Sequence, residues 1–241
     1  MPTVISRTES VVSICNQSEK DEVNDYNMKA FVITITDMEE SVQVAERCIR
    51  TGKKYGIDVE VSPAYTPKDD PLSIAKSLGI DTKGFSEIYS RLEPCLSAFL
   101  SHHKLWQWSI ENNTDVFVLE HDAVFTNFLP PVLNFKGVLS LGAPSYGQFV
   151  TPPILGVNTL VSKQYLPGAH AYIVKPKAAK VLIEKAKTIG QTTDLFICNN
   201  DFDFVEEYYP WPVEARDNFS TMQTKAGCIA KHNYDATYRI I

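Results

Sequence analysis

Several features that mark other classes of protein are scarce or missing in this sequence of 241 residues. Lys and Arg total 23 against 29 Asp and Glu, so the formal net charge is −6 and a generally basic nucleic-acid-binding surface is excluded. The five cysteines are widely spaced and form no CxxC pair, which favours single thiols in a reducing, cytoplasmic environment. No uncharged apolar run approaches the roughly 20 residues that span a bilayer, and the first residues lack the pattern of a signal peptide.

What the sequence does contain is an ordinary globular composition, with 44% hydrophobic and 22% charged residues. Such a chain can bury a sizeable core. Residues 1–29 are polar, and acidic toward their end, so we expect an appended arm. We expect residues 30–241 to form one domain.

Strand-like and helix-like segments alternate along that domain, which predicts an α/β fold. The first strand, helix and strand suggest a parallel crossover. The nearly all-apolar run 115–119 is typical of a central strand that is covered on both faces. Strands are expected at 31–36, 57–61, 115–119, 137–141 and 169–174, and helices at 40–55, 71–79, 94–112 and 176–187. The aromatic- and proline-rich last third is left unassigned.

The expected central strand ends in Glu120, His121 and Asp122. In open α/β sheets, ligands bind beyond the carboxyl ends of the strands. Carboxylates that are partly desolvated repel one another and need a cation nearby, and oxygen ligands of this kind suit Mg²⁺ or Mn²⁺. The cluster therefore indicates a metal–diphosphate site, and its alternative interpretation is a polar strand exit that faces water.

A wider set of motifs resembles glycosyltransferase family 25, the family of lipopolysaccharide-type and collagen-type galactosyl and glucosyl transferases. The motifs occur in the family's order at 101–106 (SHHKLW), 116–125 (VFVLEHDAVF), 168–174 (GAHAYIV), 193–194 (TD) and 209–221. The resemblance implies a GT-A-like domain with a mixed, mostly parallel central sheet flanked by helices. It also implies inverting transfer of a hexose from a UDP-sugar to an acceptor hydroxyl, on a glycan such as lipopolysaccharide.

The resemblance assigns a metal site. Asp122 and Glu120 would bind Mn²⁺ or Mg²⁺, and His232 stands where such enzymes often bring a C-terminal histidine to the metal. As a lone histidine near the terminus, however, His232 fits the interpretation of an exposed residue better. His102 lies on the apolar face of the expected helix 94–112, so we expect a hydrogen-bonded core histidine that braces the site.

The donor and the catalytic base are also assigned by resemblance. Thr34, Glu120, His121 and His170 are expected to bind the nucleotide sugar, and Asp194 is expected to take the proton of the acceptor hydroxyl. Asp194 can also be interpreted as a helix N-cap, because Thr and Asp residues there precede an apolar stretch.

Two alternatives stay open. One is a glycosyltransferase that acts on a hydroxylated base in nucleic acid, which the acidic net charge disfavours. The other is a nucleotide-sugar-binding protein without turnover, because the family's middle acid is replaced by His121. Both keep the nucleotide-sugar donor as a ligand, and neither calls for a transmembrane segment.

Overall fold

The structure is a computed structural model that describes residues 28–85, 90–131, 133–166, 168–216, 219–223 and 239–241. Most of the expected arm 1–29, and His232, therefore lie outside the described residues. Among the described residues, no helix is long and apolar enough to cross a membrane. The helical segments are α1 (Glu39–Lys54), η1 (Pro67–Asp69), α2 (Pro71–Ser77), α3 (Leu92–Asn112), α4 (Pro176–Ala186) and α5 (Thr193–Phe196).

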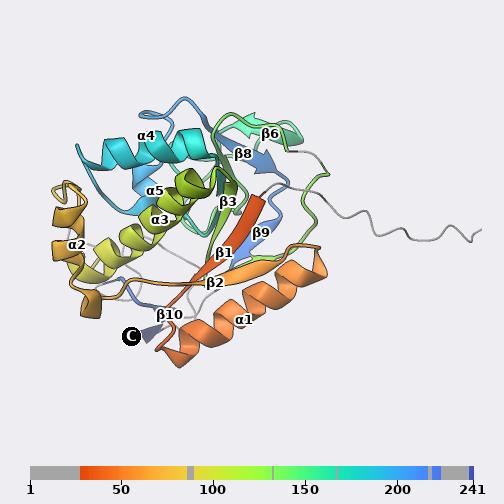
Figure 1. Cartoon of the computed structure of the whole chain (residues 1–241). Coiled ribbons are helices and arrows are strands. Elements are labelled where there is room, and N and C mark those ends of the chain that lie inside the picture. The colour runs from red at the N-terminus through yellow and green to blue at the C-terminus, as the bar shows by residue number, and fades with distance from the viewer. Residues whose placement is uncertain (1–27, 86–89, 132, 167, 217–218, 224–238) are drawn as a thin grey trace, which may run out of the picture.

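A seven-stranded sheet in the order β2-β1-β3-β7-β5-β8-β6 forms the centre of the molecule (Figure 1). Two short ladders, β4 with β9 and β10 with β11, stand beside it. The strands are β1 (Met28–Thr34), β2 (Val59–Pro63), β3 (Asp115–Glu120), β4 (Ala123–Phe125), β5 (Val138–Ser140), β6 (Gly156–Thr159), β7 (Ala171–Val174), β8 (Val205–Tyr209), β9 (Val213–Ala215), β10 (Phe219–Ser220) and β11 (Arg239–Ile240).

The sheet is mixed, as predicted, but it is not mostly parallel. The pairs β2–β1, β1–β3 and β5–β8 are parallel, whereas β3–β7, β7–β5 and β8–β6 are antiparallel. The correction has a topological reason, because β7 runs opposite to both of its neighbours. As a result, the start of β7 lies beside the end of β3, and the main-chain N–H of Glu120 donates to the carbonyl of His170 at 3.0 Å.

Two hydrophobic cores cover the two faces of the sheet, because successive side chains of a strand point to opposite faces. In β3, Val116 and Val118 pack in the core under α2, α3, α4 and α5, whereas Phe117 and Leu119 pack in the core under α1. All four side chains are fully buried. This confirms the prediction of a central strand covered on both faces.

The sequence-based helices are found within a few residues of their expected ends. The expected crossover is confirmed, since α1 connects the parallel strands β1 and β2. Gly56 follows α1 with a φ of +78°, the left-handed conformation that favours glycine after a helix. The long helix α3 begins at Leu92 rather than at Pro94. Pro94 is tolerated there because the N–H groups of a first helical turn have no intrahelical acceptor.

Candidate functional site

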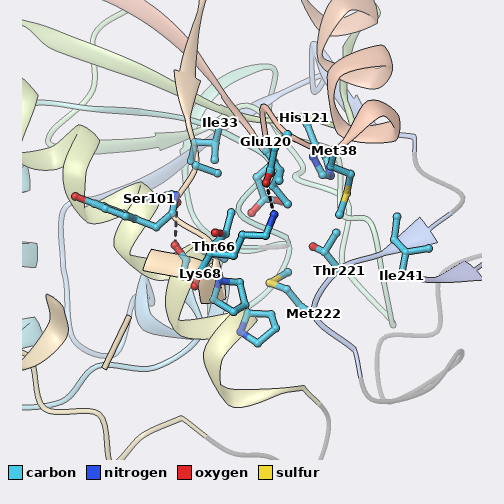
Figure 2. Close-up of a pocket in the computed structure, with 18 of the residues that line it drawn as sticks. Ile33, Met38, Thr66, Lys68, Ser101, Glu120, His121, Thr221, Met222 and Ile241 are labelled. Carbon is cyan, nitrogen blue, oxygen red and sulfur yellow. Dashed lines mark hydrogen bonds and ion pairs between the residues drawn. The ribbon is translucent and has the colours of Figure 1, made fainter. Parts of the chain in front are cut away.

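A cavity of about 540 Å³ opens at the carboxyl ends of the parallel strands β2, β1 and β3. Glu120 and His121 line it where β3 ends, and the first half of α3 forms another wall. Figure 2 shows Ser101 of α3 on one side and Thr221 and Ile241 on the other. The position agrees with the rule that ligands of open α/β sheets bind beyond the carboxyl ends of the strands.

A chain of buried hydrogen bonds holds Glu120. Trp106 Nε1 donates to the hydroxyl of Tyr172 at 2.9 Å, and that hydroxyl lies 3.0 Å from His102 Nδ1. His102 Nε2 lies 3.2 Å from Glu120 Oε1. An indole N–H can only donate, so the Tyr172 hydroxyl is free to give its own proton to Nδ1. His102 then carries its proton on Nε2 and donates it to the Glu120 carboxylate.

This chain confirms the expectation for His102, which is 1% exposed and hydrogen-bonded in the core, and it also shows how the histidine braces the site. Burial raises the pKa of Glu120, but the hydrogen bond from His102 and the electrostatic influence of His102, His170 and His121 together outweigh it. The pKa of Glu120 is therefore lowered overall. Glu120 is therefore held as a carboxylate at the cavity wall.

His121 is fixed from the other side of the sheet. Ser41, in the first turn of α1, accepts a hydrogen bond from the main-chain N–H of Ile35 at 2.9 Å. The Ser41 hydroxyl lies 2.7 Å from His121 Nδ1, and its proton is free for that nitrogen. The Nε2 edge of His121 then carries a proton, and the residue lines the cavity (Figure 2).

Asp122 is a buried carboxylate with an unused oxygen. The residue is 7% exposed, and its Oδ1 has no hydrogen-bond partner among the described residues. Burial raises the pKa of Asp122, and the negative charge of Glu120 raises it further, against smaller opposite effects of His121 and His170. A cation beside Oδ1 would relieve both effects.

His170 is the second buried polar group of this region. It is 1% exposed, and neither ring nitrogen has a hydrogen-bond partner among the described residues. Gly142 makes room for the ring, since a Cβ at Gly142 would lie 2.4 Å from His170 Nε2. His170 does not line the cavity, but its charge influences the pKa of Glu120 and of Asp122. It therefore lies close to the acidic cluster.

Thr34, which was predicted to bind the nucleotide sugar, does not line the cavity. Its side chain is 2% exposed, and its hydroxyl donates to the carbonyl of Val32 at 3.2 Å. Its neighbours Ile33 and Ile35 line the cavity instead. The alternation of side chains along a strand explains the difference, because adjacent residues point to opposite faces.

Asp194 lies outside the cavity, in the short helix α5. Thr192 occupies the N-cap position and Asp194 is the second helical residue, so the N-cap interpretation of Asp194 is wrong. The hydroxyl of Tyr146 donates to Asp194 Oδ2, and Lys163 Nζ lies 4.4 Å from the centre of the Tyr146 ring. Burial raises the pKa of Asp194, and this effect exceeds the lowering by the Tyr146 hydrogen bond. A raised pKa suits a group that takes up a proton.

The fit to a divalent metal rests on few groups. Among the described residues, no cluster of three or more His, Cys, Asp and Glu side chains is arranged to hold a metal ion. His232, the expected third ligand, lies outside them. What fits is the unpartnered oxygen of Asp122, which does not line the cavity, together with the carboxylate of Glu120, which does; both are hard oxygen ligands of the kind that Mg²⁺ and Mn²⁺ prefer.

Sequence reasoning missed the residues that orient the site. Tyr172 and Trp106 stand inside quoted motifs, but nothing in their spacing shows that one hydroxyl joins both to His102. Ser41 and Tyr146 have no local signal either. These four contacts join residues between 48 and 80 positions apart, so they depend on the tertiary fold.

Comparison of the sequence with models of protein families gave no match, and a search of curated proteins gave no significant similarity. The resemblance to glycosyltransferase family 25 therefore stays a prediction that rests on the quoted motifs. The function has to be inferred from the cavity and its side chains.

Proposed function

We propose that the protein is a metal-dependent glycosyltransferase that moves a hexose from a nucleoside-diphosphate sugar, UDP-linked, to an acceptor hydroxyl. The observation that carries the proposal is the cavity at the carboxyl ends of β2, β1 and β3, with Glu120 at its wall and the unpartnered oxygen of Asp122 two residues further along the chain. A GT-A-like nucleotide-binding sheet would present its donor site at this edge. A glycan is the favoured acceptor.

The size and lining of the cavity support a nucleotide as the ligand. It offers apolar surface for a nucleobase, from side chains such as Ile35, Tyr65 and Met222. Its charges do not suit a bare diphosphate, because four carboxylates line it against two cations, Lys68 and Arg91. Lys68 is already paired with Asp37. A divalent cation is therefore required to make diphosphate binding favourable.

Glu120 and Asp122 would hold that cation, with His232 as the candidate third ligand. A bound Mn²⁺ or Mg²⁺ would supply the positive charge that stabilises the leaving diphosphate. His102 keeps the Glu120 carboxylate charged and oriented, as the hydrogen bond at 3.2 Å indicates. His121 presents its Nε2 edge to the cavity as a donor for the nucleotide sugar.

Asp194 is the proposed base. In the transfer, the bond between the anomeric carbon and the diphosphate oxygen breaks, and a bond to the acceptor oxygen forms. The acceptor proton must move to a positioned group. Asp194 has a raised pKa and senses the charge of Glu120, so it belongs to the same acidic region. Tyr146 would orient it through the hydroxyl that donates to Oδ2.

A second candidate function is nucleotide-sugar binding without turnover. The observation that favours it is His121, which replaces the family's middle acid and is committed to Ser41 at 2.7 Å. This candidate shares the donor site and lacks only the chemistry. Transfer onto a hydroxylated nucleic-acid base has no specific observation in its favour.

Isothermal titration calorimetry with UDP in the presence and absence of Mn²⁺ tests the donor site. We expect Mn²⁺-dependent UDP binding by the wild-type protein and a loss of at least about tenfold in affinity for Asp122→Asn, because a coordinating charge is lost. Asp58→Asn, at an exposed site in the same domain, is the matched control and should bind UDP like the wild type.

The release of UDP from UDP-sugars separates the two candidates. Mn²⁺-dependent UDP release that is lost in both Asp122→Asn and Asp194→Asn supports the transferase. Binding with no release from any UDP-hexose supports the protein without turnover. A folded wild-type protein that binds no UDP with Mn²⁺ would overturn both.

A further inference from the structure

Lys163 is an isolated positive charge in the segment that precedes β7. Between Lys136 and Lys175 it is the only Asp, Glu, Lys or Arg residue. Its side chain is half-buried, and burial lowers the pKa of its ammonium. Within the described part of the chain, this ammonium forms no ion pair and donates no hydrogen bond. A partly desolvated charge without a counter-charge is unfavourable, so a bound anion would stabilise it.

Two tyrosine rings hold the ammonium in place. Lys163 Nζ lies 4.4 Å from the centre of the Tyr146 ring and 5.4 Å from the centre of the Tyr165 ring. The two rings are stacked with their centres 6.5 Å apart. Gly147 leaves room for the charge, because a Cβ at this residue would lie 3.1 Å from Nζ. Aromatic faces attract a cation but supply no oxygen acceptor, so they position the charge and leave its N–H donors to an anionic ligand.

Tyr146 also joins Lys163 to Asp194. Its hydroxyl donates to Asp194 Oδ2, and the main-chain N–H of Leu195 donates to Oδ1 at 2.9 Å. A carboxylate has about four lone-pair sites, so Asp194 can accept a further hydrogen bond from a ligand hydroxyl. Burial lowers the pKa of Lys163, and the charge of Asp194 opposes this effect although the two side chains form no ion pair. The opposite charges therefore lie near each other without direct contact. These four residues are here called the Lys163 cluster: Tyr146, Lys163, Tyr165 and Asp194.

The Lys163 cluster lies at the same edge of the sheet as the donor cavity. Strands β3 and β5 both pair antiparallel with β7, so they run in one direction and end at one edge. Tyr146 follows β5, and Lys163 and Tyr165 precede β7, which begins at that edge. Burial is the main cause that raises the pKa of Tyr146 and of Asp194, and the charge of Glu120 adds to it in both residues. The cluster does not line the cavity, but it lies within the electrostatic reach of Glu120 at the cavity wall.

We propose that the Lys163 cluster is the acceptor site and that the acceptor is an anionic sugar. An oxyanion of this sugar, a carboxylate or a phosphate, pairs with Lys163, while one of its hydroxyls donates to Asp194. The inference rests on the proposed transferase function, for which it names the class of acceptor. A neutral sugar would leave the half-buried ammonium without a counter-charge, whereas hydrogen bonds between charged groups are about twice as strong as neutral ones.

Ligand-observed NMR titrations of the wild-type protein compare three sugars: methyl β-D-glucuronide, glucose 6-phosphate and the neutral methyl β-D-glucoside. Saturating UDP and Mg²⁺ are present, so that the phosphate ester does not bind in the donor site. We expect at least one anionic sugar to bind about tenfold more tightly than the neutral one, as a charged hydrogen bond implies. Preference for the glucuronide identifies a carboxylate on the acceptor, and preference for the phosphate ester identifies a phosphate.

Three variants assign this preference to Lys163. Lys163→Gln should bind the anionic sugar about tenfold more weakly than the wild type does, and the neutral sugar equally well. Lys163→Arg keeps the charge and should retain the preference. The matched control is Lys180→Gln, which removes the same charge at an exposed position of α4 and should bind like the wild type. Circular dichroism checks that each variant is folded.

Several results would overturn the inference. A wild-type protein that binds none of the three sugars, or binds them equally, does so, as does a preference that survives in Lys163→Gln or is lost in Lys180→Gln. UDP binding separates this test from that of the proposed function, because Lys163 does not line the donor cavity and Lys163→Gln should bind UDP with Mn²⁺ like the wild type. If UDP binds and the sugars are not distinguished, the inference fails alone. If no UDP binds, the proposed function fails, and the acceptor assignment fails with it.

Discussion

The substitution Tyr172→Phe removes one hydroxyl and leaves two buried polar groups without a partner. Trp106 Nε1 loses its acceptor at 2.9 Å and His102 Nδ1 loses its donor at 3.0 Å. All three side chains are at most 1% exposed, so water does not replace the hydroxyl. Each unsatisfied buried group costs about 1–3 kcal/mol, and we therefore expect the free energy of unfolding to fall by about 2–6 kcal/mol.

Urea denaturation followed by circular dichroism measures this change. The matched control is Tyr55→Phe, because Tyr55 is only half-buried and packs its ring against Phe128. We expect the control to lose less than about 0.5 kcal/mol. If Tyr172→Phe also loses less than about 0.5 kcal/mol, and the slope of the free energy of unfolding against urea concentration is unchanged, the hydrogen-bonded chain is refuted.

The direction of the chain can be checked independently. Nitrogen-15 NMR of the histidine rings should show His102 with its proton on Nε2, because Nδ1 accepts from Tyr172. In Tyr172→Phe this tautomer should no longer be fixed. A wild-type His102 that carries its proton on Nδ1 would reverse the chain and remove the donor from Glu120.

Three further predictions concern other buried groups. Asp122→Asn should stabilise the metal-free protein at neutral pH by about 0.5–2 kcal/mol, because the raised pKa of Asp122 shows that its ionised form is unfavourable in the folded state. This gain should vanish as the pH falls below the ordinary Asp pKa, where Asp122 of the wild type is protonated in both the folded and the unfolded state. Thermal melts over a series of pH values measure the change. Glu207→Ala removes the acceptor of three hydrogen bonds and should cost at least about 3 kcal/mol in urea denaturation, whereas Glu214→Ala, on a side chain 43% exposed, should cost less than about 1 kcal/mol. Burial raises the pKa of Cys48 to about 12, so iodoacetamide at pH 8 should leave Cys48 unmodified in the folded protein and modify it in urea. The half-buried Cys198 should react under both conditions, and peptide mapping distinguishes the two sites. Modification of Cys48 in the folded protein would contradict its burial.

The parts of the fold that were predictable from the sequence are those with local causes. The run 115–119 is apolar on both faces because it is a central strand, and α1 shows the helical spacing of a surface helix with one buried side. The strands β6 and β8 gave no such signal. No residue of β6 is buried. In β8, Glu206 and Glu207 are buried because their carboxylates accept hydrogen bonds from the main-chain N–H groups of distant loops.

In the candidate site, too, some features have local causes in the sequence and others depend on the tertiary fold. Glu120 and His121 could be predicted, because a strand that ends in polar residues places them at the ligand-binding edge. Thr34, which was predicted to bind the donor, does not line the cavity for a local reason, since a shift of one residue along a strand reverses the face of the side chain. The orientation of Glu120 was beyond prediction, because it depends on Tyr172 in β7, and the antiparallel pairing of β7 with β3 is a property of the whole sheet.

The electrostatics of the acidic groups supply the physical argument for the proposed cation. Burial and the charge of Glu120 raise the pKa of Asp122, and the same charge adds to the larger effect of burial at Asp194. His102 meanwhile keeps Glu120 ionised, so the protein itself prevents the simplest relief, protonation of Glu120. The repulsion between the two carboxylates can then be reduced only by protonation of Asp122 or by the binding of positive charge. Of these two, only bound positive charge would also attract a diphosphate ligand, and for this reason added Mn²⁺ should stabilise the wild-type protein against heat and leave Asp122→Asn unchanged.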